Sequence, residues 1–345
     1  MEIKNICICG GGGQCHALAP WFSLKGFNVT VLTRRPQKWE HDISLYYLNE
    51  APKKAHIMAI TDSPKEAVSD ADLVVVTVPG YLNREELLKI KPYLKKDVYV
   101  GGVFSSNGFF FDALELLDDT TPIWGFQRVP YIGKVREYGH SANITGIKTC
   151  HHIAMEHASE EQKNTLQKCL EQTLGQPVIM HQNYLEVALS NSNPLLHPAR
   201  LYSLLGKWDF KSPIKNNPLF YEEWTDDASE YLIELDNELH NLIQRLPIAK
   251  DCLPSILKYY ECSNPSALTR KLSSIEAFKG IRSPYIKTEE GWIPDKDSRY
   301  FSEDFNYGLN KYRELAHKNG VEVPLMDEIY HWEQELMKAL SSNDQ

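Results

Sequence analysis

The sequence predicts an α/β protein in which a doubly wound parallel sheet is followed by an all-α C-terminal domain. Short apolar, β-rich runs alternate with helical patterns in the first half of the chain, which is typical of βαβ units and a buried parallel sheet. Beyond Asn183 the strand signal fades and helical periodicity takes over. A chain of 345 residues is also long enough for two domains. We therefore predict domains at residues 1–183 and 184–345.

Strand and helix are expected to alternate throughout the first domain. Apolar runs predict strands at 3–9, 28–33, 56–61, 72–80, 97–104, 122–127, 146–155 and 177–181. Helical patterns between them fall at 15–26, 63–71, 110–117 and 159–175. Because ligands of such sheets bind beyond the carboxyl ends of the strands, we expect the site at that edge.

The second domain is expected to be helical throughout. Helical patterns fall at 183–193, 194–206, 224–246, 264–280, 303–320 and 325–340. The last has one apolar face built from residues three or four apart, namely Leu325, Ile329, Trp332, Leu336 and Leu340. Such a face predicts a helix that packs against its neighbours.

Composition and charge exclude several classes of protein. The formal charge is −9, from 37 basic and 46 acidic residues, which disfavours binding to nucleic acid or to a membrane surface. No apolar run approaches the roughly 20 residues of a membrane span, and the start lacks the features of a signal peptide. Seven cysteines without a CxxC pair indicate free thiols in a reducing compartment. We predict a cytoplasmic protein, and the choice between monomer and homodimer stays open.

A glycine-rich turn after the first strand indicates a dinucleotide site. The segment "ICICGGGGQCHALA" puts Gly10, Gly12 and Cys15 at the positions of a G-x-G-x-x-G pattern, of which the first two match. Gly10 permits the tight turn, and Gly12 lets the backbone approach a pyrophosphate at the start of the helix. Cys15 is small and apolar, so it still lets helix and strand pack closely. A glycine turn without a ligand is the alternative.

The whole expected cofactor site is of the Rossmann type. Its remaining predicted members lie in the glycine turn or at the ends of the strands predicted at 28–33 and 72–80. They are Gly13, Gln14, Thr33, Arg34, Arg35, Val78 and Pro79. The second strand ends in "VLTRRPQKW" and lacks the acid that holds the ribose 2′-hydroxyl of NAD. Since guanidinium groups bind a 2′-phosphate, we predict NADP rather than NAD as the preferred cofactor. A solvated basic loop is the alternative.

Several segments together resemble a known family. They are "GGGGQCHALA", "DLVVVTVPG", "QRVPY", "NPLLHPAR" and "SRYFSEDFNYGL", in this order, and they resemble the opine dehydrogenases of the octopine/nopaline dehydrogenase group. The resemblance implies that an amino acid and a 2-oxo acid, as small-molecule partners, condense to an imine. A nicotinamide cofactor then reduces the imine to a secondary amine. It also implies that His197 is catalytic, with Asp304 as its carboxylate partner and Arg299 as a substrate-binding residue.

The chemistry of such a reaction needs a residue like His197. Amine addition requires proton transfers, and histidine titrates near neutral pH. A carboxylate on its other nitrogen would fix the tautomer of the ring. The alternatives are a buried histidine bonded to a carbonyl and, for Asp304, a carboxylate at a helix start. Asn193 is expected to cap the helix with Pro194 after it, or to touch the substrate from the same face as His197.

Other candidates carry weaker signals. Gln127 and Arg128 follow a predicted strand at the edge where a substrate carboxylate could lie, or they belong to a surface loop. Arg299 could bind a substrate carboxylate or pair with a neighbouring acid, namely Asp295, Asp297 or Glu303. The pair His151–His152 lacks a metal-ligand pattern, so no metal is predicted.

Two other functions fit the same two-domain plan. A ketopantoate-reductase-like or 3-hydroxyacid dehydrogenase would reduce a ketone without an amine, using a catalytic lysine. Lys207 is the only lysine between Asn183 and Lys211, and it does not lie on a clear helix face. A non-catalytic dinucleotide-binding sensor would keep the glycine turn but would not need His197 and Asp304.

Overall fold

The computed structural model describes residues 2–48 and 50–342. The chain divides into two compact units, Met1–Ser190 and Asn191–Gln345. The division lies slightly after the predicted boundary at Asn183. The reason is that helix α6 (Tyr184–Ala188) buries Val187 and Ala188 in the core of the first unit.

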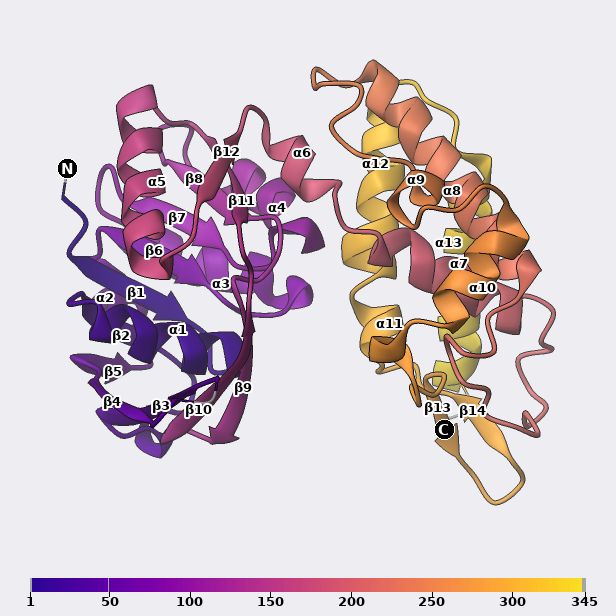
Figure 1. Ribbon diagram of the computed structural model, residues 1–345, viewed down its shortest axis with the longest axis horizontal. Helices are drawn as coiled ribbons and strands as arrows, with labels where there is room; N and C mark the ends of the chain where they lie inside the picture. Colours follow the sequence, from indigo (N-terminus) through magenta and orange to yellow (C-terminus); the bar gives the residue numbers. More distant parts are fainter. Residues whose placement is uncertain (1, 49, 343–345) are drawn as a thin grey trace. The chain divides into compact units, whose positions relative to one another are not determined.

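An eight-stranded sheet forms the centre of the first unit (Figure 1). Its strand order is β12-β11-β8-β7-β6-β1-β2-β5. The neighbours from β5 to β8 pair in parallel, whereas β11 runs antiparallel to β8 and parallel to β12. The strands are β1 (Asn5–Cys9), β2 (Asn28–Leu32), β5 (Ala59–Thr61), β6 (Leu73–Val76), β7 (Tyr99–Gly102), β8 (Ile123–Phe126), β11 (His151–Glu156) and β12 (Val178–His181). The predicted doubly wound sheet is confirmed, with an antiparallel reversal at one edge.

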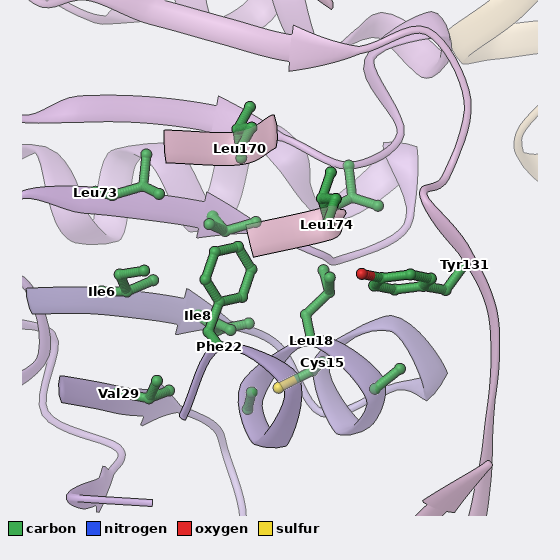
Figure 2. Close-up of a cluster of buried hydrophobic side chains, with 14 of the residues drawn as sticks. Ile6, Ile8, Cys15, Leu18, Phe22, Val29, Leu73, Tyr131, Leu170 and Leu174 are labelled. Atoms are coloured by element: carbon green, nitrogen blue, oxygen red, sulfur yellow. The ribbon is translucent and has the colours of Figure 1, made fainter. Parts of the chain in front are cut away.

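Helices cover both faces of this sheet. Helices α1 (Gly13–Leu24) and α5 (Glu160–Leu174) pack in one core cluster. Buried residues of α2 (Pro64–Val68), α3 (Asn83–Ile90), α4 (Phe110–Leu116) and α6 form the other cluster. Figure 2 shows Leu18 and Phe22 of α1 against Ile8 of β1, with Cys15 in the same cluster. Short 3₁₀ turns lie at Pro36–Lys38, Gly80–Leu82 and Lys91–Tyr93, and a π turn at Ser105–Phe109.

A second, four-stranded sheet in this unit was not predicted. Its order is β4-β3-β10-β9, formed by β4 (Lys53–His56), β3 (Asp42–Tyr47), β10 (Ser141–Ile147) and β9 (Tyr131–Glu137). Ile43 and Leu45 of β3 join the same core cluster as α1, so α1 has a sheet on two sides. A Cβ on Gly133 of β9 would lie 2.7 Å from the Cβ of Ala17, which shows how closely β9 approaches α1. The segment predicted as one strand at 56–61 is divided between β4 and β5.

The second unit is helical apart from one hairpin. Its helices are α7 (Asn193–Leu205), α8 (Asp226–Arg245), α9 (Ile256–Tyr259), α10 (Pro265–Ser273), α11 (Arg299–Ser302), α12 (Asn310–Lys318) and α13 (Pro324–Ser342), with a 3₁₀ turn at Glu276–Phe278 and a π turn, η6, at Phe305–Leu309. Strands β13 (Tyr285–Lys287) and β14 (Trp292–Pro294) pair antiparallel, so the expectation of an entirely helical domain needs this correction. None of the helices in the described residues combines the length and apolarity of a membrane span.

Candidate active site

His197 and Asp304 meet in the second unit although 107 residues separate them in sequence. His197 lies on α7, and Asp304 directly precedes the π turn η6, whose Leu309 N–H bonds to the Asp304 carbonyl at 2.8 Å. Both side chains are buried, and His197 Nδ1 lies 2.7 Å from Asp304 Oδ2. The carboxylate is therefore not a helix cap: its side chain accepts no capping bond and is directed at the imidazole.

The partners of the ring define its tautomer. A carboxylate can only accept, so Nδ1 of His197 donates its proton to Asp304. The other nitrogen, Nε2, lies 2.9 Å from the hydroxyl of Tyr221. In the neutral ring Nε2 is an acceptor, so the Tyr221 hydroxyl donates to it. Asp304, His197 and Tyr221 thus form one hydrogen-bonded chain.

Aromatic rings enclose the histidine. The Tyr300 ring lies 4.4 Å from the His197 ring in an edge-to-face arrangement, and Phe220 lies 5.6 Å away. Tyr221 stacks on Phe278 at 4.1 Å between centroids. Burial raises the pKa of Tyr221 and that of Tyr300, so both phenols stay protonated at neutral pH. Sequence reasoning missed Tyr221; the aromatic cluster "FYEEW" at 220–224 was the available signal.

The start of α7 differs from the prediction. Ser192, not Asn193, occupies the N-cap position, and Asn193 is the first helical residue, with an exposed side chain. The backbone N–H of Asn193 donates to Asn191 Oδ1 at 3.2 Å. Pro194 lies in the first turn as predicted.

Arg299 is exposed and pairs with Glu303, one turn along the chain. Its Nε and one terminal nitrogen each lie 3.1 Å from a Glu303 carboxylate oxygen. Of the three acids that the sequence offered as partners, this is the one observed. Nη1 of Arg299 makes no hydrogen bond to any described residue.

Gln127 and Arg128 lie just beyond the end of β8 and are half-buried. Arg128 Nη2 donates to the carbonyl of Ser190 at 2.8 Å, so its guanidinium holds the end of the first unit. The backbone N–H of Gln127 bonds to the His152 carbonyl, while its side chain makes no bond to the described residues.

The glycine turn has the shape that a pyrophosphate requires. Gly10 has φ +140°, and a Cβ there would collide with Thr77 Oγ1, so only glycine fits. Gly12 precedes α1 in an extended conformation, and a Cβ on it would meet no atom within 4 Å. The first turn of α1 holds no acid. An open backbone at a helix N-terminus without acids fits a dinucleotide phosphate group.

Three predicted cofactor residues, Gly13, Gln14 and Cys15, lie where helix α1 packs against its neighbours. Cys15 is fully buried in the cluster of Figure 2, and burial raises the pKa of its thiol, so it packs the helix and does not face a ligand. The Gln14 amide is buried and donates to the Tyr131 carbonyl at 3.0 Å. A Cβ on Gly13 would lie 2.5 Å from the Gly133 carbonyl oxygen. Any contact of these residues with a cofactor would come from their backbone.

The strand ends that flank the glycine turn carry the other predicted cofactor residues. Thr33 is buried just beyond β2, and Arg34 and Arg35 after it are exposed, with no acid at the end of the strand. Val78 and Pro79 follow β6, where Thr77 Oγ1 donates to the Cys9 carbonyl at 2.8 Å. These positions surround the carboxyl ends of β1, β2 and β6.

Of the two histidines of β11, His152 is held by His181 of β12 and His151 lies in the core. His152 Nδ1 lies 2.9 Å from His181 Nε2, and His181 Nδ1 lies 2.8 Å from Glu186. His151 is buried beside Phe126, with neither ring nitrogen bonded. Within the described ranges, no three His, Cys, Asp or Glu side chains are grouped as metal ligands would be.

Two family models match the chain. Residues 180–337 match the alpha-helical domain of NAD/NADP octopine/nopaline dehydrogenase, and residues 5–120 match the NAD-dependent glycerol-3-phosphate dehydrogenase N-terminus. Octopine dehydrogenase of Pecten maximus is 25% identical over 363 aligned residues, which cover 97% of this chain and 90% of that protein. Tauropine dehydrogenase of Arabella iricolor is 26% identical, with 96% and 91% covered.

Solved structures share the fold. Octopine dehydrogenase with NADH and L-arginine has a TM-score of 0.83 at 24% identity, covering 96% of this chain and 89% of that one. Yersinopine dehydrogenase with NADP⁺ has a TM-score of 0.73 at 15% identity, with 99% and 92% covered. A ketopantoate reductase from Ralstonia eutropha JMP134 is more distant, with a TM-score of 0.63 at 14% identity and 97% and 98% covered. These comparisons support the opine dehydrogenase family, whose members are NAD(P)-dependent oxidoreductases that act on CH–NH donors.

Proposed function

We propose that the protein joins an amino acid to a 2-oxo acid and reduces the product with NADPH, giving an N-(carboxyalkyl)amino acid. The observation that carries the proposal is the buried His197–Asp304 pair, in the segment that matches the octopine/nopaline dehydrogenase model. Amino acid, oxo acid, NADPH and one proton give the secondary amine, NADP⁺ and water. When bound, the nicotinamide supplies the hydride.

In this proposal His197 moves protons at Nε2. As the amine adds to the oxo carbon, Nε2 accepts a proton from nitrogen and gives it to the oxo oxygen, which becomes a hydroxyl. A second proton, taken from solvent and delivered through Nε2, then lets that hydroxyl leave as water. Asp304 keeps the Nδ1 proton in place and stabilises the ring while both nitrogens are protonated. Because the Tyr221 hydroxyl is hydrogen-bonded to Nε2, this bond must break or weaken when the reacting group of the substrate approaches Nε2.

Substrate carboxylates are proposed to bind basic and amide groups. Arg299 offers Nη1, although the Glu303 carboxylate on its other nitrogens neutralises part of its charge. We also propose that two amides contact the substrate, those of the exposed Asn193 and of Gln127. Neither side chain makes a hydrogen bond within the described residues. Arg128 is the weakest of these proposals, since it already binds the Ser190 carbonyl.

The reaction is tested by following NADPH oxidation with pyruvate, with and without each amino acid in turn. We expect oxidation only when both an amino acid and the oxo acid are present. Full-rate oxidation with pyruvate alone, in buffer free of amines, would instead support a ketone reductase. Binding of NADPH without turnover under any combination would support a dinucleotide sensor.

NADPH is proposed to bind more tightly than NADH because Arg34 and Arg35 stand where an NAD site has an acid. A charge-assisted contact to the 2′-phosphate is worth roughly 1.5–3 kcal/mol. Arg34→Ala or Arg35→Ala should therefore lower the ratio of the NADH dissociation constant to the NADPH dissociation constant at least tenfold. Arg136→Ala is the matched control, because Arg136 is an exposed arginine that stacks on Tyr46 of β3. Equal dissociation constants in the unaltered protein would refute the preference.

A cytoplasmic location is part of the proposal. All seven cysteines are free thiols in the structure, as expected for a protein kept in a reducing compartment.

A further inference from the structure

We propose that Tyr138, in the turn between β9 and β10, binds the adenosine ribose of the dinucleotide and positions Arg35 for the 2′-phosphate. The inference rests on the proposed use of NADPH, and it adds a residue far in sequence from the glycine turn. Figure 1 shows the β9–β10 pair beside the elements that begin the chain.

Two hydroxyls converge over the glycine turn. A Cβ on Gly11 would lie 2.8 Å from the Tyr138 hydroxyl and 3.1 Å from Thr33 Oγ1. Thr33 is buried, and within residues 2–48 and 50–342 neither hydroxyl has a hydrogen-bond partner. In a strand–glycine–helix unit the adenosine ribose lies next to the end of the second strand, which is where Thr33 stands. A ribose would supply the partners that both hydroxyls lack.

Arg35 is held over the same ring. Its guanidinium carbon lies 5.4 Å from the centroid of Tyr138, within the range of a cation–π contact. A guanidinium that stacks on its face keeps its N–H groups free at the edge. The phenol therefore fixes the position of a cation that can bind a phosphate on the ribose.

His16 fastens the turn to the glycine loop. The Gly139 N–H donates to His16 Nε2 at 2.8 Å, and His16 Nδ1 donates to the Gly12 carbonyl at 3.0 Å. The His16 ring also packs on Trp39 at 4.1 Å between centroids. Gly139 has φ +77°, and a Cβ on it would collide with the Lys38 carbonyl, so the turn needs glycine there. Tyr138 is thus held in place before any ligand binds.

Two substitutions separate the two roles of the residue. Tyr138→Phe removes the hydroxyl but keeps the ring under Arg35, so it should weaken NADH and NADPH equally, about five- to tenfold. Tyr138→Leu also removes the stacking surface, so NADPH binding should fall at least a further threefold relative to NADH. Dissociation constants for both cofactors are measured by quenching of tryptophan fluorescence.

The controls are Tyr46→Phe and Tyr46→Leu. The guanidinium carbon of Arg136 lies 4.0 Å from the ring centroid of Tyr46, in the same small sheet. No atom of Tyr46 is among those nearest to Gly11. Unchanged binding in both Tyr138 variants would overturn the ribose contact, and an equal loss for both cofactors in Tyr138→Leu would overturn the role in positioning Arg35. Either result, in a protein that still couples amino acid to oxo acid, leaves the proposed function standing. Loss of coupling in the unaltered protein contradicts the proposed function alone, because binding is measured without substrates.

Discussion

At the scale of the residue, the candidate site consists of a histidine whose two ring nitrogens have different partners. Asp304 takes the Nδ1 proton of His197, and the Tyr221 hydroxyl donates to Nε2. Only the nitrogen bonded to the phenol can exchange partners without breaking the hydrogen bond to the Asp304 carboxylate. Proton transfer to and from substrate is therefore expected at Nε2, because a phenol is displaced from the ring more easily than a carboxylate.

Removing the imidazole ring of His197 should abolish most turnover without affecting the binding of the cofactor. We expect His197→Ala to lower kcat about 10²–10⁴-fold, the usual effect of losing a general acid–base group. Asp304→Asn should also lower kcat, because an amide can donate to Nδ1 and shift the proton to Nε2. Dissociation constants for NADPH should stay within twofold, since the cofactor residues belong to the other unit. A His197→Ala protein with normal turnover would refute the assignment.

At the scale of the element, helix α7 positions more than the histidine. Arg200, one turn after His197, is fully buried, and burial lowers the pKa of its guanidinium to about 10. It donates to the carbonyls of Phe220 at 2.9 Å and Glu223 at 2.6 Å. These bonds hold the loop that carries Tyr221 against the helix that carries His197. Arg200 is thus a positioning residue for the hydrogen-bonded chain.

Arg200→Met should loosen that loop. The substitution removes the charge and leaves two carbonyls without a donor, so we expect a loss of about 2–3 kcal/mol in the free energy of unfolding. Arg200→Lys should recover only part of it, because an ammonium cannot match the fork of a guanidinium. Urea unfolding measures the stability, and Arg282→Met is the control, because the exposed Arg282 makes one carbonyl bond, to Asn217 at 2.7 Å. Equal losses in the Arg200 and Arg282 variants would contradict a special role for Arg200.

Sequence patterns predicted the elements that bury regular apolar faces and missed those that do not. Most of the parallel strands are continuous apolar runs and the helix of His197 has clear periodicity, so their ranges were close, whereas the run at 146–155 spans the end of β10 and most of β11. Strand β9 buries little beyond its first residue, and it therefore lacks both the apolar run and the alternation of a strand. Tyr138 and Tyr221 reach their sites from a turn and a loop, where spacing along the chain carries no information about contacts. The pairing of His197 with Asp304 came from family resemblance, since periodicity cannot join two positions so far apart.

At the scale of the whole molecule, each unit holds a histidine whose pKa is shifted, and the two shifts have opposite directions. In the first unit, burial lowers the pKa of His16, and it lowers that of His151 to about 4. In the second unit, His240 bonds to Asp236 and to the Leu253 carbonyl, and the bond to Asp236 raises its pKa to about 9. The environment therefore favours a neutral imidazole at His16 and His151 and a charged one at His240.

The two units should respond to pH in opposite directions. A folded pKa below the unfolded value of about 6.5 gives stability that is complete above that pH and is lost as the pH falls. A raised folded pKa gives stability that is complete below about 6.5 and is lost as the pH rises toward 9. We expect the first unit to weaken between pH 6.5 and 4, and the second between pH 6.5 and 9, each histidine contributing at most about 1.4 kcal/mol per pH unit. Hydrogen exchange of peptides from each unit, corrected for intrinsic rates, gives the two stabilities separately.

Carboxylates that titrate in acid would weaken both units, so variants isolate the histidines. His151→Leu removes a buried ring with two unbonded nitrogens and should flatten the acid loss of the first unit while leaving the second unchanged. His240→Gln should remove the alkaline loss of the second unit in the same way. Matching pH profiles for the two units, or variants that leave both profiles unchanged, would show that these histidines do not control the response. The expected outcome is a molecule in which acid loosens the dinucleotide-binding unit first, because burial lowers the pKa values of His16 and His151 in that unit.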